Sequence, residues 1–306
     1  MKERQLIAEL LAPLATSAAA RGLSDDGAVL TPPMGRDLVL THDVLAAGIH
    51  YLPTDPPGDT ALKLLAVNLS DLAAMGARPM GVLLGLGLSP SEDTVWLRAF
   101  TAGLERGLER WNIALWGGDT VSGLAQAVLG LTAIGQVEPG RALSRGGARP
   151  GDTLHVSGTI GDAGLGLQIA LGQAAHDAYL LHRYRLPEPR LALGQALAGV
   201  ATAAMDISDG LLIDAKRLAL ASGVALTVDL AALPLSTQAA ACTPDDTARL
   251  ERASAGDDYE LLFTLPPGAA APAGTTRIGH IAAGSGLTVL ASDGTQRVPD
   301  RLGWEH

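Results

Sequence analysis

The chain has few residues of three kinds on which many sites depend. Among its 306 residues it has one cysteine, Cys242, only three lysines, and 3% aromatic residues. A single cysteine excludes an intramolecular disulfide and any cysteine-based zinc site, and it fits an intracellular, reducing compartment. We therefore expect a cytoplasmic protein whose cores are built largely from Leu, Val, Ile and Ala.

Long apolar runs and positive charge are scarce as well. No stretch approaches the roughly 18 consecutive apolar residues of a membrane span. The formal net charge is −10, whereas a nucleic-acid binder normally carries a basic stripe. We expect neither a membrane nor a nucleic acid as a partner. An acidic chain still binds phosphates where divalent cations bridge the two.

The N-terminus, MKERQLIAELLAPLATSAAARG, has the basic start and alanine-rich stretch of a secretory signal. Glu3 and Glu9 interrupt that pattern, and the apolar residues after Arg4 recur at helical spacing. An amphipathic first helix is therefore favoured over a signal peptide.

After this helix, strands and helices alternate in both halves of the chain, which predicts two α/β domains. Predicted strands lie at 36–43, 80–88, 112–120, 125–137, 153–159, 224–230, 259–265, 276–281 and 287–290. Predicted helices lie at 58–79, 89–111, 163–172, 189–200 and 211–223. Gly117-Gly118 is expected to break its strand. The Gly-, Pro- and Arg-rich stretch 138–152 marks a domain boundary or an ordered active-site loop, so we place the domains at 1–138 and 139–306.

Aspartates beside Gly, Ser or Thr recur where predicted elements end or within a helix. They are Asp25 and Asp26 in SDDGAVL, Asp43 in THD, Asp71 in NLSD, Asp119 in GGDTV, Asp206 and Asp209 in MDISDG, and Asp257 and Asp258 in AGDDYE. Each alone has an ordinary explanation as a turn residue, a helix cap or a solvated acid. Taken together, they call for a common explanation.

The predicted helix at 58–79 supplies one. Asn68 and Asp71 lie three residues apart and share a helix face, and their neighbours are mostly apolar. Unpaired carboxylates are costly to bury, and Lys63 cannot pair with all of them. Hard cations held by carboxylates, hydroxyls and waters solve this problem, and Mg²⁺ in particular shares phosphate ligands. Phosphoryl transfer with Mg²⁺ fits this composition.

The usual phosphate-binding loop, GxxxxGK[ST], is absent, as are the protein-kinase motifs. The glycines of GTIGDAGLG (158–166) precede a predicted helix, and their N–H groups are a weak candidate for a phosphate cradle.

As an ordered set, these motifs resemble the thiamine-monophosphate kinase family. The resemblance rests on SDDGAVL, LTHDVLAAGIHY, KLLAVNLSDLAAMGARP, WGGDTV, SRGGARPGD, GTIGDAGLGL, MDISDGLLIDAKRLA, AGDDYELLFT and the terminal GWEH. Two of them, NLSDLAAMGA and MDISDGL, are shared with a wider superfamily that includes aminoimidazole ribonucleotide synthetase.

The resemblance implies transfer of the γ-phosphoryl group of ATP onto thiamine monophosphate by direct in-line attack, giving thiamine diphosphate. No covalent enzyme intermediate is implied. It further implies an N-terminal α/β domain that dimerises through its sheet, carrying the metal and ATP site, and a C-terminal α/β domain. The nucleotide is expected to lie between the two domains, and the chain to form a homodimer.

Carried over by position, the resemblance implies three sets of site residues. The Mg²⁺ ligands are Asp26, Thr41, Asp43, Asp71, Asp119, Asp206 and Asp209. The nucleotide contacts are Gly118, Asp119, Arg145 and Ser208. The thiamine monophosphate contacts are His50, Asp257 and Trp304.

Plainer alternatives stay open for several of these residues. His50 also fits a surface histidine, and Trp304 a hydrophobic anchor for the C-terminus. Arg141 or Arg149 fits the role of Arg145 as well. In MDISDG, Asp209 fits a helix cap in addition to a metal ligand.

Two departures from the family pattern affect the assignments. His42 stands where the family usually has a small hydroxyl residue, and because neutral imidazole suits Mg²⁺ poorly it is left out of the metal set. AGDDYE stands where the family usually has Gly-Gly-Glu-Asp-Tyr-Glu, so Ala255 replaces a glycine and Asp257 is one methylene shorter than glutamate.

Other readings of the whole chain remain. Selenophosphate synthetase is expected to carry a reactive cysteine near its N-terminus, and the hydrogenase maturation factor one at its C-terminus, whereas Cys242 is in neither place. Aminoimidazole ribonucleotide synthetase matches the C-terminal segments less well. A non-catalytic thiamine-phosphate or nucleotide binder would follow if the changes at 42, 255 and 257 abolished activity, but retention of all the aspartates disfavours it.

Overall fold

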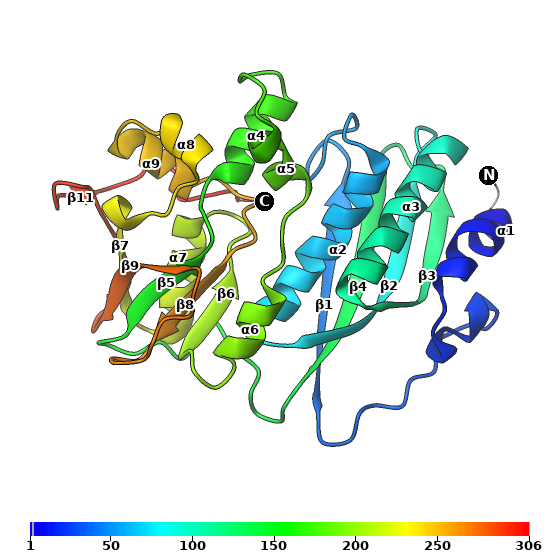
Figure 1. The fold of residues 1–306 in the computed structure, drawn as a ribbon, viewed down its shortest axis with the longest axis horizontal. Coiled ribbons are helices and arrows are strands. Elements are labelled where there is room, and N and C mark those ends of the chain that lie inside the picture. The colour runs from blue at the N-terminus through cyan, green and yellow to red at the C-terminus, as the bar shows by residue number, and fades with distance from the viewer. Residues whose placement is uncertain (2, 306) are drawn as a thin grey trace. The chain divides into compact units, whose positions relative to one another are not determined.

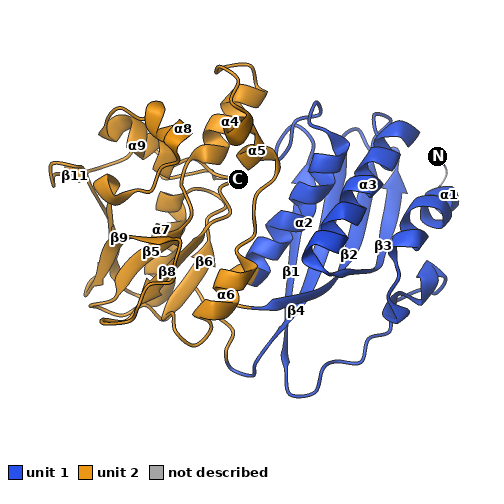
Figure 2. Cartoon of the chain, in the orientation of Figure 1, with its two compact units in different colours: residues 1–72, 77–140 blue, residues 73–76, 141–306 orange. Residues whose placement is uncertain are grey.

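The computed structural model describes residue 1 and residues 3–305, and the chain divides into two compact units (Figures 1 and 2). Unit 1 comprises Met1–Leu72 and Ala77–Gly140, and unit 2 comprises Ala73–Gly76 and Arg141–His306. Each unit contains one sheet with packed helices, which confirms the predicted α/β class.

Unit 1 contains a four-stranded sheet in the order β1-β4-β2-β3. The strands are β1 (Asp37–Ala46), β2 (Arg78–Leu88), β3 (Ala114–Ser122) and β4 (Val128–Val137). Strand β4 pairs antiparallel with both β1 and β2, and β2 pairs parallel with β3. Helices α2 (Pro57–Ala74) and α3 (Thr94–Trp111) cover one face of this sheet (Figure 1).

The opposite face of the unit 1 sheet carries exposed apolar side chains. Because successive strand residues point to opposite faces, Val39 and Leu45 of β1 are buried while Leu38, Leu40 and Val44 are exposed. Leu40 is 65% exposed, which is unusual for a leucine in the middle of a strand. This face is therefore apolar and uncovered in the single chain.

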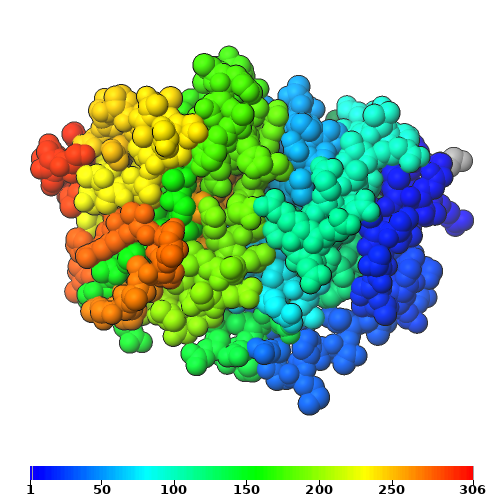
Figure 3. All heavy atoms as spheres, viewed as in Figure 1, coloured from blue at the N-terminus to red at the C-terminus, as the bar shows by residue number. Residues whose placement is uncertain are grey.

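The N-terminal segment forms four short helical elements, and the first three follow one another without a gap over residues 3–14, where the amphipathic helix was predicted. They are α1 (Glu3–Leu6), η1 (Ile7–Leu11), η2 (Ala12–Leu14) and η3 (Ala18–Leu23). Pro13 is part of the η2 turn, and positive φ angles at Arg21, Gly22 and Leu23 prevent a regular helix further on. The first turns still bury Leu6 and Leu11, and they lie against α3, where Arg98 reaches Glu9 at 3.5 Å (Figure 3).

The predicted break at Gly117-Gly118 is wrong, because β3 continues through both glycines to Ser122. The pairing with β2 shifts just before them, because Val82 and Leu83 pair with Leu115 and Gly117 and leave Trp116 as an extra residue in β3. A side chain at position 118 would overlap the backbone oxygen of Leu84. Glycine is therefore needed here for close pairing of the strands, and it does not end the strand.

Unit 2 contains a seven-stranded sheet in the order β11-β10-β7-β9-β5-β8-β6. The strands are β5 (Thr153–Ser157), β6 (Ala203–Asp206), β7 (Ala225–Asp229), β8 (Leu261–Leu265), β9 (Thr275–Ala282), β10 (Gly286–Leu290) and β11 (Gln296–Arg297). The helices are α4 (Asp162–Ala170), α5 (Ala178–Arg185), α6 (Leu191–Leu197), α7 (Leu211–Ser222), η4 (Leu230–Ala232), α8 (Thr237–Ala241) and α9 (Asp246–Ala253). The main core lies between α7 and this sheet.

Among the described residues, no helix has the length and apolarity needed to cross a membrane.

Helices α2 and α3 pack closely at Gly58 and Gly103, where a Cβ atom on Gly103 would overlap the backbone of Gly58. We predict that Gly103→Ala lowers the stability of the fold by about 1–3 kcal/mol, because overpacking against backbone cannot relax. This loss outweighs the gain of about 1 kcal/mol in helix propensity. The change in the free energy of unfolding is measured by thermal denaturation. The control is Ala102→Gly on the exposed side of α3, which measures the difference in helix propensity between Ala and Gly alone. A stabilised Gly103→Ala variant would contradict the close packing.

Candidate active site

In unit 1, strand β1 and helix α2 bring three of the predicted metal ligands together. Thr41 and Asp43 lie two residues apart on β1 and face α2. The Thr41 hydroxyl donates to Asp71 Oδ2, and the Asp43 backbone N–H donates to Asn68 Oδ1 at 2.9 Å. Asn68 is fully buried, and it also donates to the Leu64 carbonyl at 2.9 Å. The predicted shared face of Asn68 and Asp71 is thus the face that meets β1.

His42 lies on the other face of the unit 1 sheet, because strand alternation places it opposite Thr41 and Asp43. Its Nδ1 is 2.9 Å from Thr132 Oγ1, and the ring packs over Gly130. The histidine that departs from the family pattern therefore points away from the acids of β1 and α2.

Asp119 and Gly118 lie on β3 at some distance from Asp43. The register aligns Asp43 with Leu131, Leu131 with Leu84, and Leu84 with Gly118. Two strands separate the ends of this row, so Asp43 and Gly118 are about 14 Å apart at ~4.8 Å per strand. Asp119 is exposed, and Asp26 is exposed in the segment that follows η3. Asp119 therefore lies apart from the group formed by Thr41, Asp43 and Asp71.

His50 lies in the turn after β1, between Ala47 and Tyr51, which form an isolated bridge. Its Nδ1 accepts a hydrogen bond from the Ala46 backbone N–H at 3.1 Å. Its carbonyl accepts from the buried Lys63 Nζ at 3.0 Å. The turn that presents His50 is thus fixed by its own ring and by the one lysine near these acids.

In unit 2, the MDISDG segment is held by two others that carry predicted substrate contacts. Asp257 N–H donates to the Ser208 carbonyl, and Tyr259 N–H to the Ile207 carbonyl, both at 2.8 Å. Trp304 N–H donates to the Asp209 carbonyl at 2.8 Å. The backbone therefore brings Ser208, Asp209, Asp257 and Trp304 together, with Asp206 at the end of β6 beside them.

Unusual backbone geometry marks the AGDDYE segment. Asp257 has φ of 70° and Tyr259 has φ of 50°, values that L residues other than Asn and Asp seldom adopt. A Cβ atom on Gly256 would lie 2.8 Å from the Ser208 carbonyl. Such strain persists only where surrounding contacts fix it, and here the paired hydrogen bonds to MDISDG do so.

Arg217 and Asp214 of α7 hold the Asp209 side chain. Arg217 Nη1 donates to Asp209 Oδ2 at 2.6 Å and to Asp214 Oδ1 at 2.7 Å. The other oxygen of Asp214 accepts from the Ser208 and Asp209 backbone N–H groups at 3.1 and 3.2 Å. Burial raises the pKa of Asp214 to about 6, although Arg217 opposes the shift. The start of α7 has no side-chain cap, since its N-cap residue is Gly210, and Asp214 instead holds the turn that precedes the helix.

The predicted phosphate cradle at GTIGDAGLG already has a ligand from the chain itself. Asp258 Oδ2 accepts from the Gly161 N–H at 2.7 Å, and Asp258 Oδ1 accepts from the Ala163 N–H at 3.4 Å. The interpretation of these N–H groups as a phosphate site is therefore wrong for this structure. Desolvation by burial raises the pKa of Asp258 to about 8, and nearby Asp162 adds to the effect.

Two arginines balance the buried acids around Asp258. Arg183 Nη2 donates to Glu260 Oε1 at 2.9 Å and to the Asp258 carbonyl at 3.3 Å. Arg190 forms a two-point contact with Glu260 at 2.6 and 2.5 Å. The Glu260 carbonyl in turn accepts from Ile207 N–H at 2.8 Å. This buried ionic cluster thus contacts the segment that carries Asp257 and, through Glu260, the residue that follows Asp206.

Arg145 does not join this group. Its carbonyl accepts from the Ser222 hydroxyl at 3.1 Å, at the C-terminal end of α7. Ser208 and Asp209 lie at the N-terminal end, and a 12-residue helix spans about 18 Å. The backbone of unit 2 therefore separates Arg145 from the other predicted contacts.

Sequence reasoning missed Arg217, Asp214, Arg183 and Arg190. The spacing of Asp214 and Arg217 at i and i+3 on a predicted helix was an available signal for an ion pair. Nothing local in the sequence connects Arg183 or Arg190 with Glu260, which is at least 70 residues away.

The chemistry of the donors fits a hard divalent cation. The predicted ligands are carboxylates and one hydroxyl, the oxygen donors that Mg²⁺ prefers, and Asp209 already holds a cation, the Arg217 guanidinium. Across the described part of the chain, no three His, Cys, Asp or Glu side chains are grouped to hold a metal on their own. This agrees with the way Mg²⁺ is usually bound, by one or two carboxylates together with waters and substrate phosphates.

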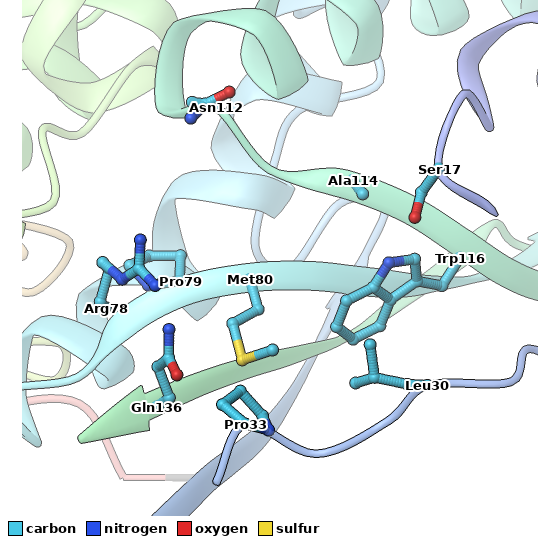
Figure 4. Close-up of a pocket in the computed structure, with 10 residues that line it drawn as sticks. All are labelled: Ser17, Leu30, Pro33, Arg78, Pro79, Met80, Asn112, Ala114, Trp116 and Gln136. Carbon is cyan, nitrogen blue, oxygen red and sulfur yellow. The ribbon is translucent and has the colours of Figure 1, made fainter. Parts of the chain in front are cut away.

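A separate pocket of about 400 Å³ lies in unit 1, where the N-terminal segment crosses part of the sheet face opposite α2 and α3. Figure 4 shows Met80 and Trp116 directed toward the segment that carries Leu30 and Pro33, and the Gln136 amide directed toward Arg78. Its other lining residues are Ser17, Arg78, Pro79, Asn112 and Ala114. None of these ten belongs to the predicted site.

Comparison with known proteins defines the class. Residues 24–137 match the family described as AIR synthase related protein, N-terminal domain, and residues 149–296 match its C-terminal domain. The two units thus carry the paired domains of this class, which confirms the predicted two-domain fold.

Individual relatives narrow the class. Thiamine-monophosphate kinase of Caulobacter vibrioides is 42% identical over 98% of this chain and 89% of its own length. The crystal structure of thiamine-monophosphate kinase from Stenotrophomonas maltophilia K279a superposes with a TM-score of 0.80 at 40% identity, covering 90% of this chain and 91% of its own. The structure of AaThiL complexed with AMPPCP and TMP has a TM-score of 0.81 at 29% identity, covering 98% and 94%. The chain belongs to the thiamine-monophosphate kinase family.

The buried Asp258 makes a pH-dependent contribution to stability. Its folded pKa lies above the ordinary 3.8, so the folded protein holds a proton that the unfolded chain releases. This contribution is complete below about pH 4 and is lost as the pH rises through about 8. We predict that the thermal midpoint of the wild type falls relative to that of Asp258→Asn between about pH 5 and pH 8.5. If the thermal midpoints of the two proteins changed in parallel with pH, the raised pKa of Asp258 would be refuted. Asp300→Asn, which removes an exposed acid, is the control for the change in net charge.

Proposed function

We propose that this protein transfers the γ-phosphoryl group of ATP to thiamine monophosphate, giving thiamine diphosphate and ADP. The main observation in support is a set of backbone hydrogen bonds that join MDISDG to AGDDYE and to Trp304. These bonds bring together Ser208, Asp209, Asp257 and Trp304. The relatives support the same reaction, since AaThiL was solved with AMPPCP, an analogue of ATP, and with TMP.

The transfer proceeds in line in this proposal. An oxygen of the acceptor phosphate forms the new bond to Pγ while the bond from Pγ to the β-phosphate oxygen breaks, and ADP leaves with that electron pair. Such reactions depend on positioning and charge neutralisation. No nucleophilic side chain is required, and none is assigned.

Mg²⁺ ions, when bound, neutralise the phosphates so that two anions can approach each other. Thr41, Asp43 and Asp71 form the ligand group of unit 1, and Asp206 and Asp209 that of unit 2, with Asp26 and Asp119 as further ligands. The Thr41 hydroxyl and the Asn68 amide orient Asp71 and the Asp43 backbone.

The remaining residues contact the two substrates. Gly118, Asp119, Ser208 and Arg145 are assigned to the nucleotide, Arg145 as a clamp on a phosphate oxygen. His50 and Asp257 are assigned to thiamine monophosphate. Trp304, 49% exposed, is assigned to the cationic thiazolium through the ring face opposite Arg301, whose guanidinium lies 5.1 Å from the ring centroid.

A homodimer formed through the unit 1 sheet completes the proposal. The exposed Leu38, Leu40, Val44 and Val121 support it, because a second copy would cover this apolar face. We also propose a cytoplasmic location, in keeping with the single exposed Cys242.

The activity is tested by incubating purified protein with ATP, Mg²⁺ and thiamine monophosphate, with free thiamine as the control acceptor. Thiamine diphosphate formed from the monophosphate alone is the expected result. Folded protein that binds nucleotide but forms no product would overturn the proposal.

Asp71→Asn tests the metal group of unit 1. We predict a loss of turnover of at least about 100-fold, because one developing charge loses its counter-ion, with little change in thermal stability. The matched control is Glu105→Gln, an exposed acid on α3, which should retain wild-type turnover. Wild-type turnover in Asp71→Asn would contradict the ligand assignment.

A further inference from the structure

The ion pair between Arg217 and Asp209 has no place in the reaction described above. Arg217 Nη1 lies 2.6 Å from Asp209 Oδ2, and their side chains are 38% and 17% exposed. The same nitrogen also contacts the fully buried Asp214 at 2.7 Å. One guanidinium therefore serves two carboxylates, one of which is an assigned metal ligand.

Asp214 anchors this arrangement on both sides. Its Oδ2 accepts from the backbone N–H groups of Ser208 and Asp209, while its Oδ1 holds Arg217. The loop backbone and the arginine are thus fixed to the same buried carboxylate. As a result, the guanidinium is held beside Asp209 even when no divalent cation is near.

A divalent cation on Asp209 Oδ2 would have to replace or share this contact. Carboxylate oxygens that donate to a hard cation give up hydrogen bonds in the same directions, and a guanidinium and a metal ion at one oxygen repel each other. The charge of Arg217 also offsets the repulsion between Asp209 and Asp214.

We propose that Arg217 is a positioning residue that serves as a resident counter-ion for Asp209 and competes with the divalent cation for its carboxylate. The ion pair keeps the loop in place without metal and lowers the affinity of Asp209 for free cations. A cation that binds Asp209 has to displace Arg217. Binding is therefore favoured when the cation arrives together with the phosphates of the nucleotide. This inference rests on the assignment of Asp209 as a metal ligand under the proposed function.

The test is the affinity for Mn²⁺ without nucleotide, measured by electron paramagnetic resonance of the free ion. We expect Arg217→Gln to bind the Asp209-dependent Mn²⁺ about two- to fivefold tighter than the wild type, the range expected when a partly exposed ion pair is removed. Lys216→Gln is the matched control, since it removes the same charge from the adjacent, exposed position of α7. It should leave the affinity within about 1.5-fold of wild type, because a solvated charge without a direct contact contributes little.

Arg217→Lys keeps the charge but not the planar fork, and it should bind Mn²⁺ more nearly like the wild type. Unchanged or weaker binding by Arg217→Gln, or equal tightening by Lys216→Gln, would overturn the inference. Asp209→Asn separates it from the proposed function. If that variant retains every Mn²⁺ site, the metal role of Asp209 itself fails, whatever Arg217 does.

A measurement on the wild type covers the case in which Arg217→Gln does not fold. In a crystal structure with Mn²⁺ bound to Asp209, we expect Arg217 to have moved out of hydrogen-bond distance from Oδ2. A contact kept at its present 2.6 Å beside a bound ion would overturn the competition.

Discussion

Negative charge that is partly buried has to be balanced, and this requirement shapes both units. In unit 1, Asp71 and Asp43 meet a buried amide, Asn68, and a hydroxyl, while the nearby Lys63 is used by the carbonyl of His50. In unit 2, Arg217 balances Asp209 and Asp214, and Arg183 and Arg190 balance Glu260. In unit 2, one guanidinium thus serves both an acid assigned to metal, Asp209, and a buried structural acid, Asp214.

The same division explains how the site is positioned. The structural acids Glu260, Asp258 and Asp214 are fully or almost fully buried, and each is bonded to backbone groups or arginines that hold a neighbouring segment. Glu260 and Asp258 fix the AGDDYE segment, which pairs with MDISDG, and Asp214 fixes the turn at the start of α7. In unit 2, buried carboxylates that stabilise the fold therefore hold the segments that carry the acids assigned to metal.

Much of the fold could be predicted because hydrophobic patterns decide it. The strand that became β1 and the helix that became α2 have long, clear patterns and were placed within a few residues. Helices α5, α8 and α9 are only five to eight residues long and were missed, since so few turns give little periodicity. Gly117-Gly118 was predicted to end its strand, because glycine has a low strand propensity. In the structure both glycines pair with β2, and this pairing outweighs the local propensity.

The site was predictable in its parts but not in its contacts. Motif resemblance singled out Ser208, Asp209, Asp257 and Trp304, and the structure brings them together through backbone hydrogen bonds that no local pattern encodes. Asp258 likewise accepts hydrogen bonds from the GTIGDAGLG amides only because of the tertiary structure, since it is 97 residues away from Gly161 in the sequence. The position of Arg145 at the far end of α7 shows that nearness in a motif list does not establish nearness in the fold.

The central claim is that the acids of β1–α2 and of MDISDG hold divalent cations for phosphoryl transfer. The most direct measurement is anomalous diffraction from crystals grown with Mn²⁺, AMPPCP and thiamine monophosphate. We expect Mn²⁺ peaks within bonding distance of the carboxylates of Asp71 and Asp209, each shared with a phosphate oxygen. Both ligands bound in place with no metal on either carboxylate would contradict it.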